Sequence, residues 1–251
     1  MPDAVTFDYW ETLCTEVERG HLRSRRLEAV VAVMAQAGVA VDAARLGTAY
    51  DGVWASWVQN WRENRQFTGV DAAGQLLAGL GGTTPGSATH RCAVEAFVAS
   101  AEGAELVLIP GVREVLEALA DAGIRVGIVC DVGFTPSPVL RAHLDRHGVL
   151  DAFDHWSFSD EVGVYKPDRR IFAHALEGLG NVRPHEAAHV GDRRRTDVAG
   201  ARAMGIRAVR FAGVNDDADP SEGPSGDAVI TDHAELPAVL GIRGPGSPAD
   251  R

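Results

Sequence analysis

Apolar residues recur with two different periods along this chain. Residues 4–7 form a short apolar run that stops at Asp8, which is typical of a buried strand. A period of about 3.6 residues follows and predicts helices over residues 18–37, 42–64, 71–80 and 88–101. Because no β-rich run interrupts them, residues 16–104 are predicted to form an all-helical insert.

From residue 106 onward, strands alternate with helices. Short apolar runs predict strands over residues 124–129, 155–158, 187–190 and 206–211, with helical segments between them. This alternation implies βαβ units with right-handed crossovers, and therefore a parallel sheet. We predict an α/β protein with a Rossmann-like core over residues 1–15 and 105–241, the helical domain over residues 16–104, and a disordered tail over residues 242–251.

The composition narrows the class of protein. Hydrophobic residues make up 45% of the 251 residues and charged residues 24%, as in ordinary globular domains. A formal net charge of −11 disfavours binding to nucleic acid or to an anionic membrane, and no apolar run reaches the roughly 18 residues of a membrane span. No signal peptide precedes the first strand, and the three cysteines are odd in number and widely spaced. These features predict a cytoplasmic protein with reduced thiols.

Carboxylates follow three of the predicted strands, at Asp8, Asp131 and Asp192. The carboxyl ends of parallel strands meet at one edge of a sheet, so these side chains are expected to converge. Asp8 and Asp192 suit Mg²⁺, which takes a few carboxylates together with water and a substrate phosphate. Asp8 would then attack phosphorus. Any single aspartate could instead be a helix N-cap, but an ordered set is harder to explain in that way.

Lys166 and Asp197 complete the candidate set. Lys166 is the only lysine in a chain that otherwise uses arginine, which favours a position where only a compact ammonium group works, although chance is the alternative. Lys166 is expected to offset negative charge on Asp8 and on a phosphoryl group. Asp197 follows Asp192 by five residues and could hold a metal-bound water or orient Lys166.

These stretches, in this order, resemble the haloacid dehalogenase-like (HAD) hydrolase superfamily over about residues 4–212. The four family motifs are matched by Phe-Asp8-Tyr-Trp10-Glu-Thr12-Leu, Ile-Val-Cys130-Asp131, Gly-Val-Tyr-Lys166-Pro-Asp and Val-Gly-Asp192-Arg-Arg-Arg-Thr-Asp197. The resemblance implies that Asp8 is the nucleophile and that Asp8, Asp192 and the backbone carbonyl of Trp10 hold Mg²⁺. It also implies that the helical insert is a cap. A buried acid pair without a cation would be costly, so Asp192 favours Mg²⁺ and a small phosphate ester as the substrate.

Two positions depart from the family pattern. Trp10 stands where the phosphatases carry an aspartate that protonates the leaving group, and such general acid catalysis is worth about 10²–10⁴-fold. Glu11 and Asp131 are the nearest replacements. Cys130 stands where a serine or threonine binds phosphate; a thiol is a weak donor, so backbone N–H groups near Asp131 are expected to take over, unless Cys130 is itself reactive.

Three functions are compatible with these residues. A Mg²⁺-dependent phosphatase acting on a small organic phosphate is the preferred hypothesis. A metal-independent dehalogenase also has an aromatic residue at the position of Trp10, but it lacks the Gly-Asp pair that is present here as Gly191 and Asp192. The third is a catalytically impaired protein that binds a ligand or partner. The substrate and the oligomeric state are not predicted.

Overall fold

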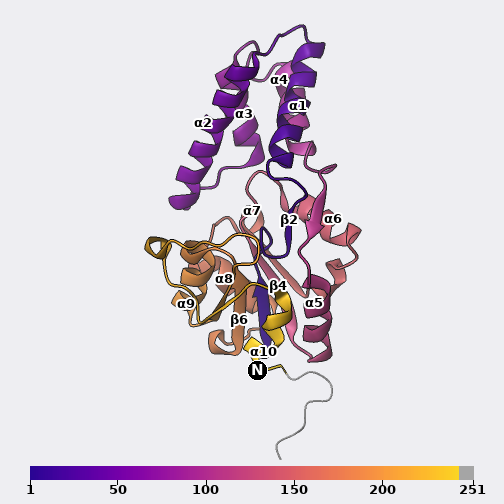
Figure 1. The fold of residues 1–251 in the computed structure, drawn as a ribbon. Coiled ribbons are helices and arrows are strands. Elements are labelled where there is room, and N and C mark those ends of the chain that lie inside the picture. Colours follow the sequence, from indigo (N-terminus) through magenta and orange to yellow (C-terminus); the bar gives the residue numbers. More distant parts are fainter. Residues whose placement is uncertain (243–251) are drawn as a thin grey trace, which may run out of the picture. The chain divides into compact units, whose positions relative to one another are not determined.

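The computed structural model describes residues 1–242, so the tail predicted over residues 242–251 lies outside the described residues from residue 243 onward. The chain divides into two compact units (Figure 1). The α/β unit contains Met1–Thr15, Val107–Asp131 and the chain from Leu144 onward. The helical unit contains Glu16–Leu106 and Val132–His143. The interpretation of the helical unit as a cap stays a prediction.

A six-stranded sheet in the order β5-β4-β1-β6-β7-β8 forms the centre of the α/β unit. Every pair of neighbouring strands runs parallel, so the predicted α/β class with a parallel sheet is confirmed. The strands are β1 (Ala4–Phe7), β4 (Arg125–Cys130), β5 (His155–Phe158), β6 (Ala187–Gly191), β7 (Arg207–Phe211) and β8 (Ala228–Ile230).

β1 lies in the interior of this sheet. All four of its residues are buried, as expected for a strand whose two faces are both covered. Phe7 pairs with Ile128 on β4 and with Val190 on β6. The chain adds β4 and β5 on one side of β1 and then returns to place β6 on the other side. The carboxyl ends of β1 and β6 therefore flank a topological switch point, which is where open α/β sheets bind ligands.

Helices connect the strands of the α/β unit. One apolar cluster packs α8 and α9 against the sheet and includes Val129, Ile171, Phe172, Ala201 and Ala208. The helices are α5 (Val112–Asp121), α6 (Ser137–Arg146), α7 (Ser159–Val162), α8 (Arg169–Gly178), α9 (Ala199–Met204) and α10 (Leu236–Leu240), with a π-helix over Arg194–Val198 and short 3₁₀ turns over Leu150–Ala152, Pro184–Glu186, Pro220–Glu222 and His233–Glu235. α6 crosses the division between the two units.

The helical unit contains α1 (His21–Gln36), α2 (Ala43–Arg62), α3 (Gly69–Leu80) and α4 (Ala88–Ala99). Gly20 adopts a left-handed backbone with φ 87° immediately before α1, so this helix begins at His21 rather than at residue 18. The side chains of Asp42, Thr68 and Ser87 cap the other three helices by accepting a backbone N–H three residues later. The helices bury a separate apolar core that includes Val30, Met34, Val53, Leu76 and Phe97.

Two short strands lie where the chain passes between the units. β2 (Cys14–Glu16) and β3 (Leu106–Leu108) pair in a two-stranded sheet that the sequence analysis did not predict, because three residues are too few to show a period. Within residues 1–242, no helix combines the length and the apolar character needed to cross a bilayer. The cytoplasmic location stays a prediction.

Candidate active site

Asp8 lies at the carboxyl end of β1, at the switch point. Its backbone N–H donates to the carbonyl of Val190 on β6 at 2.8 Å, which continues the parallel pairing by one residue and holds the two strand ends together. Asp8 is only 6% exposed. A carboxylate in this position is shielded from bulk water and depends on nearby cations for charge compensation.

Lys166 lies between two of the predicted carboxylates. Its Nζ atom is 2.5 Å from Oδ1 of Asp8 and 2.7 Å from Oδ1 of Asp197, and it donates to the carbonyl of Val129 at 3.0 Å. Its backbone N–H donates to Oδ1 of Asp131 at 2.9 Å. Lys166 is 2% exposed, so all three donors of the ammonium group are used inside the protein.

Asp197 is held close to the end of β6 by the tight turn that follows this strand. A Cβ atom on Gly191 would lie 2.3 Å from Cγ of Asp197, so this approach requires glycine. Oδ1 of Asp197 accepts from Lys166 and from Nε2 of His189, and Oδ2 accepts from the backbone N–H of Arg193 at 3.0 Å. Because both oxygens already accept hydrogen bonds, Asp197 is better suited to orienting Lys166 than to binding a metal directly.

Asp8, Asp192 and Asp197 each offer a carboxylate oxygen, and these oxygens lie within 4.8 Å of one another. Burial raises the pKa of Asp8, against the effect of Lys166, and burial together with Asp197 raises the pKa of Asp192 to about 7. Burial alone would lower the pKa of Lys166, but Asp197 and Asp8 hold it above its usual value. Lys166 and His189 hold the pKa of Asp197 below its usual range despite burial.

The charges of this acidic cluster (Asp8, Asp192 and Asp197 with Lys166) fit a divalent cation. Three carboxylates face one ammonium group, so the fully ionised cluster has two negative charges in excess. A buried excess of negative charge favours either protonation or the binding of a cation. Clustered carboxylate oxygens are the ligands that Mg²⁺ prefers. The donor set therefore fits Mg²⁺.

The other predicted site residues lie around this cluster within the α/β unit. Trp10 is half-buried, and its ring contacts that of Tyr9 edge-on at 5.1 Å between centroids. Glu11 has a left-handed backbone with φ 56° and accepts from the hydroxyl of Thr15 at 3.2 Å. Cys130 is fully buried, and burial raises the pKa of its thiol well above its usual value. A buried thiol of this kind is unreactive, which argues against Cys130 as a nucleophile.

Two residues that the sequence analysis did not assign to the site also contact the cluster. His189 on β6 bridges the hydroxyl of Thr6, at 2.8 Å from Nδ1, and Asp197, at 3.0 Å from Nε2. Burial lowers the pKa of His189, so the neutral ring donates through Nε2 and accepts through Nδ1. Asn215 donates from Nδ2 to Oδ2 of Asp192 at 2.6 Å. The position of His189 inside an otherwise apolar strand was the one feature of the sequence that could have indicated its role. No feature of the sequence indicated a role for Asn215.

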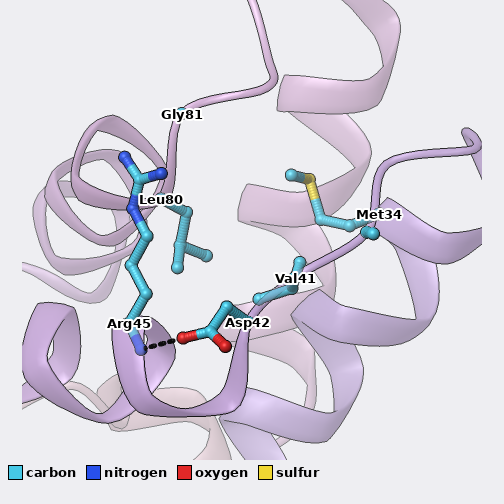
Figure 2. Close-up of a pocket in the computed structure, with 7 residues that line it drawn as sticks. Met34, Val41, Asp42, Arg45, Leu80 and Gly81 are labelled. Atoms are coloured by element: carbon cyan, nitrogen blue, oxygen red, sulfur yellow. Dashed lines mark hydrogen bonds between the residues drawn. The ribbon is translucent and has the colours of Figure 1, made fainter.

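A small pocket in the helical unit offers different chemistry. Its lining includes Met34, Val41 and Leu80 together with Asp42 and Arg45 (Figure 2). The Asp42 carboxylate accepts the backbone N–H of Arg45 at 2.8 Å, and the Arg45 side chain donates to the carbonyl of Gly79 at 3.1 Å. These polar groups cap and join helices, so we assign no reaction chemistry to this pocket.

Comparisons with known proteins identify the family of this chain. A family model described as haloacid dehalogenase-like hydrolase matches residues 2–205. A glyceraldehyde 3-phosphate phosphatase from Pyrococcus furiosus is 37% identical over 137 residues, which cover 53% of this chain and 53% of that protein. The match thus spans about half the length of this curated relative.

Solved structures share the fold over nearly the whole chain. A HAD phosphatase from Thermococcus onnurineus has a TM-score of 0.62 and 25% identity, covering 95% of this chain and 98% of its own. A 2-haloacid dehalogenase from Pseudomonas syringae has a TM-score of 0.71 and 24% identity, covering 96% of this chain and 99% of its own, and shows the fold alone. Because the family model spans most of the sequence and includes the segments that carry Asp8, Lys166 and Asp192, this chain belongs to the haloacid dehalogenase-like hydrolases.

Proposed function

We propose that this protein is a Mg²⁺-dependent phosphatase that acts on a small organic phosphate through an aspartyl-phosphate on Asp8. The observation that carries the proposal is the buried cluster in which Lys166 joins Asp8 to Asp197, with an oxygen of Asp192 within 4.8 Å of theirs. The phosphatase from Pyrococcus furiosus, whose name gives a small sugar phosphate as its substrate, supports this class of reaction.

Each residue has a separate role in this proposal. Asp8 forms a bond to phosphorus while the bond from phosphorus to the leaving oxygen breaks, and water then releases phosphate from Asp8. Lys166 stabilises the Asp8 carboxylate and the negative charge of the phosphoryl group. Asp8 and Asp192, with the backbone carbonyl of Trp10, would hold Mg²⁺, and Asp197 would orient Lys166. When bound, the metal supplies positive charge beside the phosphoryl oxygens.

Trp10 limits which phosphates can react. An indole cannot protonate a leaving oxygen, and both candidate replacements have hydrogen-bond partners: Glu11 accepts from Thr15, and Asp131 accepts the backbone N–H of Lys166. Loss of general acid catalysis costs about 10²–10⁴-fold when the leaving group is poor. We therefore infer that the enzyme favours substrates whose leaving group is stable as an anion.

The direct test is hydrolysis of p-nitrophenyl phosphate, whose leaving group needs little protonation. We expect turnover with Mg²⁺, loss of turnover with EDTA, and at least about 10³-fold loss in Asp8→Asn because the nucleophile is removed. Asp121→Asn, at the exposed end of α5, is the matched control and should keep the wild-type rate.

Trp10→Asp tests the inference about the leaving group, with Trp10→Phe as its control. Trp10→Asp should gain activity on alkyl phosphates by about 10-fold or more, whereas Trp10→Phe should not. Turnover that survives both EDTA and Asp8→Asn would contradict the phosphatase mechanism. Metal binding without any turnover in either the wild type or Trp10→Asp would instead support a protein that binds a ligand without catalysis.

Dehalogenation is a second candidate because of Trp10. A departing halide needs no proton, so an aromatic residue at position 10 would carry no penalty. The cluster of carboxylates opposes this candidate, since a metal-free dehalogenase has no use for the excess negative charge. Release of halide from 2-haloacids in the presence of EDTA would favour dehalogenation over phosphatase activity.

A further inference from the structure

Asn215 makes a contact that the proposed reaction does not use. Its side-chain amide donates to Oδ2 of Asp192 at 2.6 Å, and Nε of Arg193 lies 3.7 Å from the same oxygen. Within the described part of the chain, the polar contacts of the Asp192 side chain therefore fall on Oδ2. Since Asp192 is 2% exposed, water does not readily replace these donors.

The loop that carries Asn215 is held in place by the two residues that follow it. Asp216 accepts from Nη1 of Arg210 at 2.7 Å. The Asp217 side chain accepts the backbone N–H of Arg194 at 2.7 Å, and the Asp217 carbonyl accepts from Nε of Arg194 at 2.5 Å. Both arginines are buried, at 5% and 9% exposed. Three consecutive side chains thus have fixed partners, so the amide of Asn215 is preorganised toward Asp192.

A donor fixed on one carboxylate oxygen has a consequence for the choice of cation. Ca²⁺ accepts carboxylates that bind through both oxygens, in flexible coordination by about 6–8 oxygen atoms. Mg²⁺ is smaller, requires nearly octahedral geometry and is usually bound through one or two carboxylates with several waters. An amide on Oδ2 hinders coordination through both oxygens of Asp192 and leaves single-oxygen coordination possible.

We propose that Asn215 is a specificity-determining positioning residue, which restricts Asp192 to one oxygen and thereby selects Mg²⁺ over Ca²⁺. The inference rests on the proposed function, since it assumes that Asp192 binds the metal. The arginines that follow Asp192 have a role in it, because Arg194 holds the loop that presents the amide.

Calorimetric titration of the metal-free full chain with MgCl₂ and with CaCl₂ tests this proposal without relying on turnover. The measured quantity is the ratio of the Ca²⁺ dissociation constant to the Mg²⁺ dissociation constant. In Asn215→Ala we expect this ratio to fall by about 10-fold, because Ca²⁺ gains a second oxygen while Mg²⁺ does not. Val214→Ala, a neighbouring exposed position, is the matched control and should leave the ratio unchanged.

The outcomes separate this proposal from the function on which it rests. If wild type and Asp192→Asn bind Mg²⁺ equally, or neither binds it, the metal site itself fails. Suppose instead that binding depends on Asp192 but that Asn215→Ala changes both dissociation constants by the same factor. Asn215 then only shields charge, and the proposal that it selects Mg²⁺ over Ca²⁺ is overturned. An equal change of the ratio in Val214→Ala would assign the effect to the loop as a whole and also overturn it. Unfolding midpoints without metal verify that each variant is folded.

Discussion

At the scale of single residues, burial changes the pKa values of the carboxylates in the acidic cluster. An exposed group of three aspartates would remain ionised and hydrated, whereas Asp8 and Asp192 have raised pKa values because little water reaches them. Lys166 compensates one of the three charges. The charge that remains makes the metal-free cluster sensitive to pH.

The pH dependence of stability can be predicted for Asp192. Burial and Asp197 raise the pKa of Asp192 from the ordinary 3.8 to about 7 in the folded protein, so on raising the pH the unfolded chain loses this proton first. Asp192 therefore contributes a loss of stability to the metal-free protein between about pH 4 and pH 7. Above pH 7 we expect Asp192→Asn to be more stable than wild type by about 1–4 kcal/mol, a difference that disappears below pH 4.

Urea unfolding in EDTA at pH 4, 6 and 8 measures this difference. Asp121→Asn supplies the control for an exposed aspartate and should match wild type at every pH. A variant Asp192→Asn that is no more stable than wild type at pH 8 would show that the ionised carboxylate is not costly in the folded protein.

The proximity of the candidate residues that end strands could be predicted from the sequence, but the residues that contact them could not. Asp8 and Asp192 follow apolar runs, so the rule that parallel strands end at one edge was enough to predict their proximity. Asn215 contacts Asp192 from a polar loop 23 residues away. From sequence that segment is expected to be a loose loop, and only its hydrogen bonds with Arg194 and its ion pair with Arg210 reveal its order.

At the scale of elements, the end of β6 is tightly constrained by its neighbours. β6 pairs with β1 and β7, carries His189, and ends at Gly191, beside which Asp197 packs. The π-helix over Arg194–Val198 follows almost at once and contains Asp197. A strand that turns this sharply into a helix leaves no room for a side chain at position 191.

Gly191→Ala is expected to displace Asp197 and, through it, Lys166. The new Cβ would lie 2.3 Å from Cγ of Asp197, so one of them must move. Misplacement of a catalytic group by about 1 Å can cost on the order of 10²-fold in rate, and we expect a loss of that size in Mg²⁺-dependent hydrolysis. Gly52→Ala in α2, where a Cβ meets nothing within 4 Å, is the control. Activity of Gly191→Ala within threefold of wild type would contradict the argument.

The existence of the long elements could be predicted because their apolar periods extend over many residues. The helices of the helical unit belong to this group, whereas the strands at the centre of the parallel sheet were indicated by short apolar runs between helical segments. β2 and β3 could not be predicted, since each contains three residues and their pairing joins positions about 90 residues apart. The late start of α1 depends on the backbone angle of Gly20, which the apolar period does not report.

At the scale of the whole molecule, hydrogen exchange can test where in the fold the metal binds. Binding to the folded state slows exchange that requires unfolding, by about 100-fold when the ligand is present at about 100 times its dissociation constant. Hydrogen–deuterium exchange with Mg²⁺ should therefore slow amides in β1 and β6, up to about this factor. Asp192→Asn should show no such slowing. Protection that persists in Asp192→Asn would place the metal elsewhere.

Because Lys166 is buried, covalent labelling of its amine can report when the acidic cluster becomes exposed to solvent. Lys166 is the only lysine of the chain and is 2% exposed, with its amine hydrogen-bonded on three sides. Acylating reagents that attack neutral amines therefore have a single lysine target, and it is hidden while the fold is intact. The appearance of an acyl group on the peptide that contains Lys166, followed over time by mass spectrometry, counts the molecules in which this site has opened.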